Sequence, residues 1–232
     1  NCSASVSKYI AQRFDRELLR QFPNVDGVLP LTHKGGCAMQ FGGDDHQQLA
    51  RTMAGFTKHP NIGAYLIIGL GCETASIPYL VDREHLVQIN GTGGGKPQLP
   101  PIITMQEVGG TQKTLEAGLR TVAEMLPMVN DVRRVPIPAS EIVLGLNCGG
   151  SDGNSGVTCN PALGVASDMI VACGGTTILA ETTEIYGAEH LLTRRARSPQ
   201  IADKLLERIK WWLWYTRVFG CEIDNNPSVG NK

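Results

Sequence analysis

The chain has 232 residues, of which 42% are hydrophobic and 19% are charged, and its formal net charge is −1. This near-neutral composition speaks against a nucleic-acid or membrane-surface partner, and no apolar stretch approaches the roughly 20 residues that a membrane-spanning helix needs. Seven cysteines, an odd number in a long chain, argue against a secreted disulfide scaffold. We therefore expect a reduced, cytoplasmic protein.

Short apolar runs alternate along the chain with segments of helical character. Strands are predicted at residues 25–31, 64–68, 102–106, 141–146 and 176–180, and helices at residues 44–58, 111–125, 161–172 and 199–219. This alternation predicts an α/β fold with a mainly parallel sheet and flanking helices, in a Rossmann-like three-layer arrangement. Residues 1–232 are expected to form a single domain. The chain starts without Met and stops in a turn-rich stretch, so we expect a piece truncated at both ends.

Each predicted strand is followed by a polar loop that carries Gly, Cys, His, Glu or Asp. In open parallel sheets, ligands bind at the carboxyl ends of the strands. We therefore expect these loops to converge at one edge of the sheet and to form a binding site there. The alternative is that they are plain turns connecting strands to helices.

Four cysteines are candidate metal ligands. Cys37, Cys72 and Cys148 lie on three of the loops, and Cys2 is placed after a strand that would precede the chain. Thiolates bind iron and zinc well. The alternative is that cysteine serves as a small core residue, and this is the interpretation we adopt for the three on or near helices: Cys159, Cys173 and Cys221.

Further polar residues are candidates for proton transfer and ligand binding. Glu181 follows the fifth strand, where a carboxylate can bind a hard cation or act as a general base. It can instead be a charge that favours a helix N-terminus. Arg194 can clamp a carboxylate or lie in a solvated basic turn. The loop from residue 149 to 155 is dense in backbone donors and hydroxyls, which suits a polar ligand but also a surface turn. Its predicted ligand contacts are Gly149, Gly150, Ser151, Asp152 and Ser155.

Several motifs together resemble one enzyme family. They are the run 144–153 (LGLNCGGSDG), the segments 155–158 and 160–162, the start 1–4, the His33-x-x-Gly36-Cys37 loop, and the stretches 69–73, 109–111 and 224–232. They resemble the altronate and galactarate dehydratases over essentially the whole chain. The run 184–192 is more similar to the altronate type, and sulfolactate-cleaving enzymes carry similar motifs. The departures from the pattern are Ala38, Asn147 and Cys159.

The resemblance implies a carbon–oxygen lyase that removes water from a sugar acid such as altronate to give a 2-keto-3-deoxy sugar acid. It implies divalent iron, or manganese or another divalent metal, for which Cys2, Cys37, Cys72 and Cys148 are the candidate ligands, and it makes the chain the second, central domain. His33 is the first candidate for the acid or base, and Glu181 is the second. The partner is then a small sugar acid, with the oligomeric state open and a homo-oligomer as one outcome.

Other activities stay open at the level of sequence. They are galactarate dehydratase, sulfolactate sulfo-lyase, and a non-catalytic α/β domain that binds a sugar acid. A nucleotide-binding domain is a further rival, but the glycine fingerprints it would need are incomplete.

Overall fold

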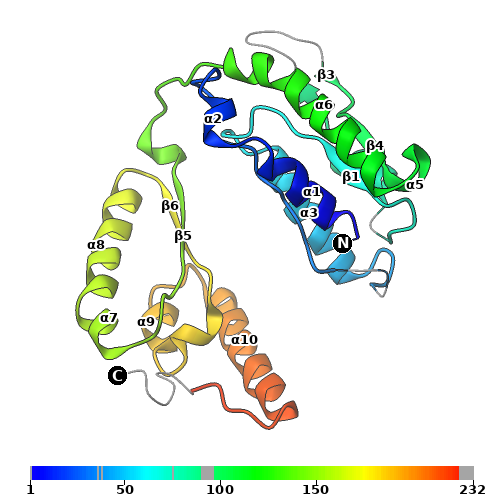
Figure 1. Ribbon diagram of the computed structural model, residues 1–232. Helices are drawn as coiled ribbons and strands as arrows, with labels where there is room; N and C mark the ends of the chain where they lie inside the picture. The colour runs from blue at the N-terminus through cyan, green and yellow to red at the C-terminus, as the bar shows by residue number, and fades with distance from the viewer. Residues whose placement is uncertain (1, 36, 38, 75, 90–96, 225–232) are drawn as a thin grey trace. The chain divides into compact units, whose positions relative to one another are not determined.

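The computed structural model describes residues 2–35, 37, 39–74, 76–89 and 97–224 (Figure 1). The chain divides into two compact units, Asn1–Arg134 and Val135–Lys232, where the sequence predicts a single domain. They are called unit 1 and unit 2 below, and each is described by itself. In the described part of the chain, no helix is long and apolar enough to cross a bilayer.

Unit 1 combines helices with two short strand pairs (Figure 1). Strands β1 (Ile67–Gly69) and β4 (Ile102–Thr104) pair in parallel, with Gly69 opposite Thr104, and β2 (Gln88–Ile89) pairs antiparallel with β3 (Pro97–Gln98). The helices are α1 (Ala4–Gln12), α2 (Arg16–Leu19), α3 (Asp44–Thr57), α4 (Ile77–Glu84), α5 (Met105–Val108) and α6 (Thr111–Asn130).

The core of unit 1 lies where α1 meets α6. Val6 and Ile10 lie four residues apart on one face of α1. Both are buried together with Phe14, which follows the helix, and with Leu126 of α6. Gly118 allows the close approach of the helices, because a Cβ atom there would lie 2.3 Å from Ile10 Cδ1. This packing fixes α1 against α6.

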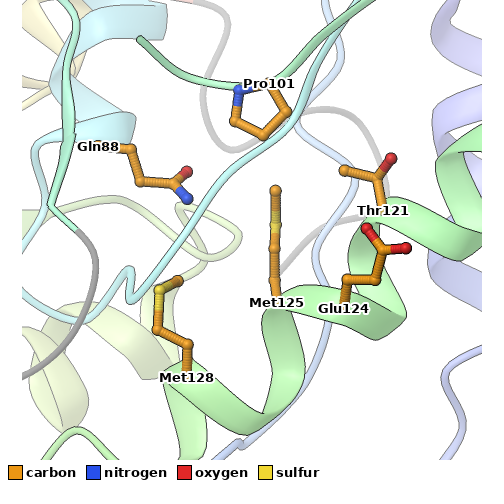
Figure 2. Close-up of a pocket in the computed structure, with 6 residues that line it drawn as sticks. All are labelled: Gln88, Pro101, Thr121, Glu124, Met125 and Met128. Carbon is orange, nitrogen blue, oxygen red and sulfur yellow. The ribbon is translucent and has the colours of Figure 1, made fainter. Parts of the chain in front are cut away.

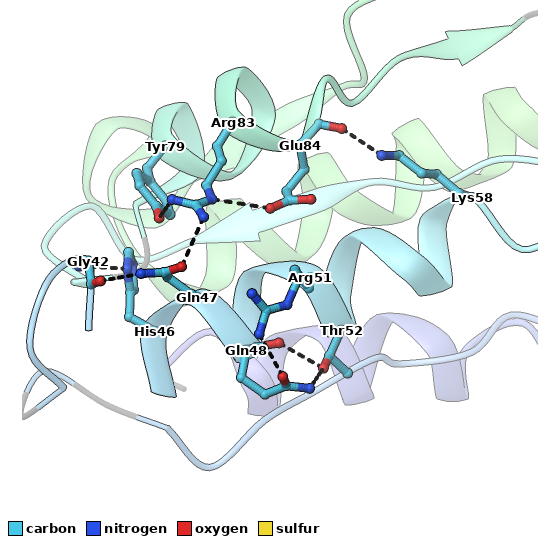
Figure 3. A network of polar contacts seen from close by, with 10 residues as sticks. All are labelled: Gly42, His46, Gln47, Gln48, Arg51, Thr52, Lys58, Tyr79, Arg83 and Glu84. Carbon is cyan, nitrogen blue, oxygen red and sulfur yellow. Dashed lines mark hydrogen bonds and ion pairs between the residues drawn. The ribbon is translucent and has the colours of Figure 1, made fainter. Parts of the chain in front are cut away.

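A polar network joins α3 to α4 (Figure 3). The guanidinium of Arg83 donates to the Tyr79 hydroxyl at 2.8 Å and to Gln47 Oε1 at 3.1 Å. Lys58 Nζ donates to the backbone carbonyl of Glu84 at 2.7 Å. His46, fully buried, packs its ring against Tyr79 with centroids 4.4 Å apart and accepts the Gly42 N–H at Nδ1. His46 is therefore a packing residue of this helix pair.

Unit 2 is built around one parallel strand pair, β5 (Val143–Leu146) and β6 (Thr176–Leu179). The connection between them runs through α7 (Gly153–Val157) and α8 (Cys159–Ala172). It is a helical crossover, which is the usual connection between two parallel strands. Ser167 of α8 donates to the Thr177 hydroxyl at 2.9 Å, which ties the crossover helix to β6. The remaining elements are η1 (Ala139–Glu141), η2 (Thr182–Ile185), α9 (Glu189–Thr193) and α10 (Pro199–Val218).

Much of the apolar surface of unit 2 is exposed. Within its described residues, Ile209 is the single buried hydrophobic side chain, whereas Val165, Met169 and Trp214 are 61%, 66% and 59% exposed. On α10, the rings of Trp211 and Tyr215 stack with centroids 4.9 Å apart. The aromatic residues of this helix therefore pack against one another along its surface.

The predicted elements are confirmed in most places. The structure has strands within or next to residues 64–68, 102–106, 141–146 and 176–180, and all four predicted helices are present with ends shifted by a few residues. The strand predicted at 25–31 is wrong, because this stretch has no regular structure. Pro30 there lacks the N–H that strand pairing needs, and Gly27 weakens a strand. In the described ranges each sheet has two strands, so the predicted three-layer arrangement around a larger parallel sheet is not seen.

Candidate functional site

The carboxyl ends of β5 and β6 bring two predicted site residues together. Leu146 and Leu179 are paired in the parallel register, so Cys148 and Glu181, each two residues further on, leave the same edge of the strand pair. The Cys148 N–H donates to Glu181 Oε2 at 2.5 Å, and both side chains are half-buried. The register of the strands thus explains a contact between residues 33 positions apart.

A second acidic residue, Glu184, completes this cluster as its third member. Glu184 lies one turn after Glu181 in η2, and one ligand atom each of Cys148, Glu181 and Glu184 lie within 4.8 Å of one another. In the described ranges, this is the one group of three or more His, Cys, Asp or Glu side chains with such a spacing. A thiolate with two carboxylates is a donor set that suits a divalent transition metal. The residues present therefore fit the expected kind of cation.

The glycine-rich loop after β5 has a fixed end and an open surface. Asp152 caps α7 by accepting the backbone N–H of Ser155 at 2.9 Å and its hydroxyl at 2.5 Å, and these hydrogen bonds lower the pKa of Asp152. A Cβ atom added at Gly149, Gly153 or Gly156 would meet nothing within 4 Å. Packing within the described structure therefore does not require these glycines, and their backbone stays accessible to a polar ligand.

Unit 1 holds a separate small cavity of about 90 Å³. Its polar lining includes Cys2, His33, Cys37, Glu73 and Thr74. Apolar side chains form the rest of the wall, among them Ile67, Ile77 and Leu80. The cavity therefore joins three of the loops singled out in the sequence: the N-terminal segment, the His33 loop and the loop after β1.

His33 is the proton carrier that this cavity offers. Its Nδ1 atom is buried and makes no hydrogen bond of good geometry in the described part of the chain, and the backbone of Gly35 is the polar group beside the ring. Burial lowers the pKa of His33 below its ordinary value of 6.5, and the nearby Glu73 carboxylate opposes part of that effect. The imidazole is therefore neutral at neutral pH and can accept a proton.

Two residues that the sequence did not single out hold the loops around the cavity. Glu73 Oε2 accepts the backbone N–H groups of Leu70 at 3.1 Å and Gly71 at 2.7 Å. The Thr74 hydroxyl donates to the carbonyl of Cys37 at 3.2 Å, which links the loop after β1 to the His33 loop. An acidic residue two or three positions after a strand-ending Gly-x-Gly is a signal that could have identified Glu73.

A larger, open pocket of about 390 Å³ lies elsewhere in unit 1 (Figure 2). Thr121, Glu124, Met125 and Met128 of α6 form one of its sides. Gln88 and Pro101 complete the lining, and Gln88 accepts the Tyr65 N–H at 3.3 Å. With a single carboxylate and no thiol or imidazole in its lining, this pocket lacks the side chains that metal binding or proton transfer would use.

Comparison with known proteins matches both units to one family. Residues 1–130 match the model described as D-galactarate dehydratase/altronate hydrolase, second domain. Residues 139–232 match the model described as D-galactarate/altronate dehydratase, C-terminal. The chain belongs to the D-galactarate/altronate dehydratase family. The boundary between the two models falls at residues 131–138, where unit 1 gives way to unit 2.

Curated relatives of known name cover the chain from end to end. Altronate dehydratases of Bacillus subtilis and Escherichia coli are each 35% identical over 231 residues, and the galactarate dehydratase (L-threo-forming) of Escherichia coli is 37% identical over 235. The alignments take in 100% of this chain and 44% of each relative, so the chain spans less than half of their length. The beta subunit of (2R)-sulfolactate sulfo-lyase from Chromohalobacter salexigens is 32% identical over 78% of the chain.

Of the four cysteines predicted as metal ligands, three belong to unit 1 and one belongs to unit 2. Cys2 and Cys37 line the cavity of unit 1, and Cys72 is exposed on the loop beside it. Cys148 belongs to unit 2, with Glu181 and Glu184. Arg194 is exposed at the end of α9, outside the hydrogen bonds of that cluster. The prediction that three cysteines lie in the core is wrong, because all three are exposed at or near the ends of helices: Cys159, Cys173 and Cys221.

Proposed function

We propose that this chain carries catalytic residues of a sugar-acid dehydratase, and that the full-length protein removes water from altronate to give a 2-keto-3-deoxy sugar acid. The observation that carries the proposal is the pairing of Cys148 and Glu181 at the ends of β5 and β6, in a chain of the D-galactarate/altronate dehydratase family. Because the chain spans 44% of its relatives, the activity is assigned to the whole protein.

Removing a proton beside a carboxylate builds up negative charge on the substrate, and this charge is the main barrier to the reaction. A divalent cation such as iron or manganese, bound by Cys148, Glu181 and Glu184, would supply positive charge to stabilise it. The open backbone of the loop at Gly149 and Gly153 supports the binding of the carboxylate or hydroxyl groups of the substrate.

The proton itself requires a base and the departing hydroxyl requires an acid. His33 is the proposed base, because its buried Nδ1 makes no hydrogen bond of good geometry in the described ranges and burial lowers its pKa. Glu181 is the second candidate, but its Oε2 already accepts the Cys148 N–H, which favours a structural or metal-binding role.

Altronate is proposed as the substrate because the run 184–192 is similar to the altronate type. Overall identity does not separate the two dehydratases, at 35% for altronate and 37% for galactarate. The match to a sulfolactate sulfo-lyase subunit supports one alternative, in which the same elimination from a hydroxy acid expels sulfite in place of water.

The test is a steady-state assay of the full-length protein on altronate, galactarate and sulfolactate, each with and without added Fe²⁺ under anaerobic conditions. We expect turnover of altronate that is lost on treatment with a chelator and restored by Fe²⁺ or Mn²⁺. Turnover of galactarate or sulfolactate alone would replace the proposed substrate, and no turnover of the three would reject the dehydratase proposal.

A further inference from the structure

Ser151 has a backbone conformation that L-amino acids rarely adopt. Its φ is +51°, in the left-handed region, where a side chain with a Cβ atom is strained. The neighbouring Gly149, Gly150 and Gly153 are absent from the positive-φ positions of the described chain. The strained position of this loop is therefore occupied by a serine, although glycine would adopt the conformation without strain.

The contacts of Ser151 account for the strain. Its backbone N–H donates to Cys148 Sγ at 3.2 Å, and its Oγ lies 2.9 Å from the same sulfur. The hydroxyl donates its proton to Glu184 Oε2 at 2.8 Å. Since a hydroxyl has one proton, Oγ accepts from the Cys148 thiol when it donates to Glu184. Ser151 thus contacts two of the three members of the cluster at once.

We propose that Ser151 is a positioning residue that fixes the Cys148 thiol and the Glu184 carboxylate relative to each other. This inference rests on the proposed role of the Cys148, Glu181 and Glu184 cluster in binding a divalent cation. It replaces the substrate contact that the sequence predicts for Ser151, because its N–H and hydroxyl are both used within the protein.

Because Ser151 is strained, glycine and alanine variants separate the effect of the backbone conformation from the effect of the hydroxyl. Ser151→Gly removes the strain and the hydroxyl together, whereas Ser151→Ala removes the hydroxyl alone. The matched control is His85→Gly. His85 also has a left-handed φ, of +50°, but it is an exposed residue that ends α4 and takes no part in the cluster.

The experiment measures alkylation of Cys148 by iodoacetamide in the reduced full-length protein, resolved by peptide mass spectrometry, with and without Mn²⁺. We expect Ser151→Gly and Ser151→Ala to raise the rate of Cys148 labelling several-fold without metal. We expect the Mn²⁺ concentration that half-protects Cys148 to rise about 10- to 100-fold in both variants, the usual effect of losing a group that orients a ligand. His85→Gly should leave both quantities at their wild-type values.

Thermal melting completes the test. The melting temperature of Ser151→Gly should equal or exceed that of the wild type, as for His85→Gly, so a loss of Mn²⁺ protection cannot come from unfolding. Wild-type labelling and Mn²⁺ protection in both Ser151 variants would overturn the inference. An inactive wild-type enzyme would reject only the proposed function, because labelling without metal is read without turnover.

Discussion

The imidazole of His33 connects the chemistry of the unit 1 cavity to pH. In the folded state its pKa lies below the ordinary 6.5, mainly because it is buried. As the pH falls through 6.5, the unfolded chain binds the proton before the folded chain does. His33 therefore lowers the stability of unit 1 progressively from that pH downward.

His33→Gln should change both activity and acid sensitivity. We expect kcat of the full-length protein on altronate to fall about 10²- to 10⁴-fold, the usual contribution of a general base, and the acid limb of kcat/KM, below pH 6.5 in the wild type, to disappear. The stability lost between pH 7 and 5 should be smaller than in the wild type. Near-normal turnover would remove His33 from the mechanism.

A second residue-scale prediction concerns Glu73. Glu73→Ala removes the acceptor of two backbone N–H groups, at Leu70 and Gly71, at a cost of about 1–3 kcal/mol. Hydrogen–deuterium exchange in the peptide covering residues 69–73 should then accelerate about 10-fold. Glu73→Gln keeps an oxygen acceptor and should show a smaller effect, and equal exchange in all three proteins would contradict the role of Glu73.

Some of these residues could be foreseen from the sequence and others could not. Cys148 and Glu181 could be paired, since parallel strands end at one edge and both residues follow predicted strands. The role of Ser151 could not, because a positive φ at a non-glycine residue next to three glycines has no sequence signal. Thr74 was also missed, since its contact with Cys37 joins loops 37 residues apart.

At the scale of elements, the junction between α8 and β6 depends on a glycine. A Cβ atom at Gly175 would lie 2.9 Å from the carbonyl oxygen of Ile142 and 3.1 Å from that of Ala139. Those oxygens belong to the backbone. The Ile142 carbonyl, directly before β5, accepts the Thr176 N–H at 2.9 Å, so its movement would disturb the start of the β5–β6 pair.

Gly175→Ala should therefore destabilise the β5–β6 pair by about 1–3 kcal/mol, a typical cost of overpacking. Gly164→Ala is the matched control, because a Cβ atom within α8 would meet nothing within 4 Å there and alanine favours a helix by about 1 kcal/mol. Urea denaturation should give the two variants opposite signs. Equal stability would show that the backbone at Gly175 adapts.

Element prediction succeeded where a single segment carries the signal. The helices 111–130 and 199–218 are predictable from the length of their segments and from the residues at which they start. The stretch 25–31 is predicted as a strand from its two valines and two leucines alone. A strand needs a partner, and partners are set by the fold as a whole. For the same reason, the number of strands in each sheet could not be predicted from the sequence.

At the scale of the molecule, the two units differ in how much apolar surface they bury. The described part of unit 1 has two clusters of buried hydrophobic side chains, whereas unit 2 buries Ile209 and exposes much of α8 and α10. Such exposed surface binds hydrophobic dyes and promotes association.

The polypeptides 1–134 and 135–232, prepared separately, should therefore behave differently. We expect 1–134 to unfold cooperatively, and 135–232 to bind the dye ANS strongly and to associate. Dye fluorescence and analytical ultracentrifugation at equal concentrations would show this. A monomeric 135–232 with no more ANS binding than 1–134 would contradict the contrast in burial.

Six of the seven cysteines are exposed, and Cys148 is the half-buried exception. Air oxidation should therefore reach the outer thiols first and link molecules into disulfide ladders, visible on a non-reducing gel, while the thiol beside Glu181 is still reduced. Protein stored in air would therefore become heterogeneous through its exposed cysteines before Cys148 is oxidised. A reductant added early would thus restore a homogeneous sample, whereas one added late would also have to reduce Cys148 itself.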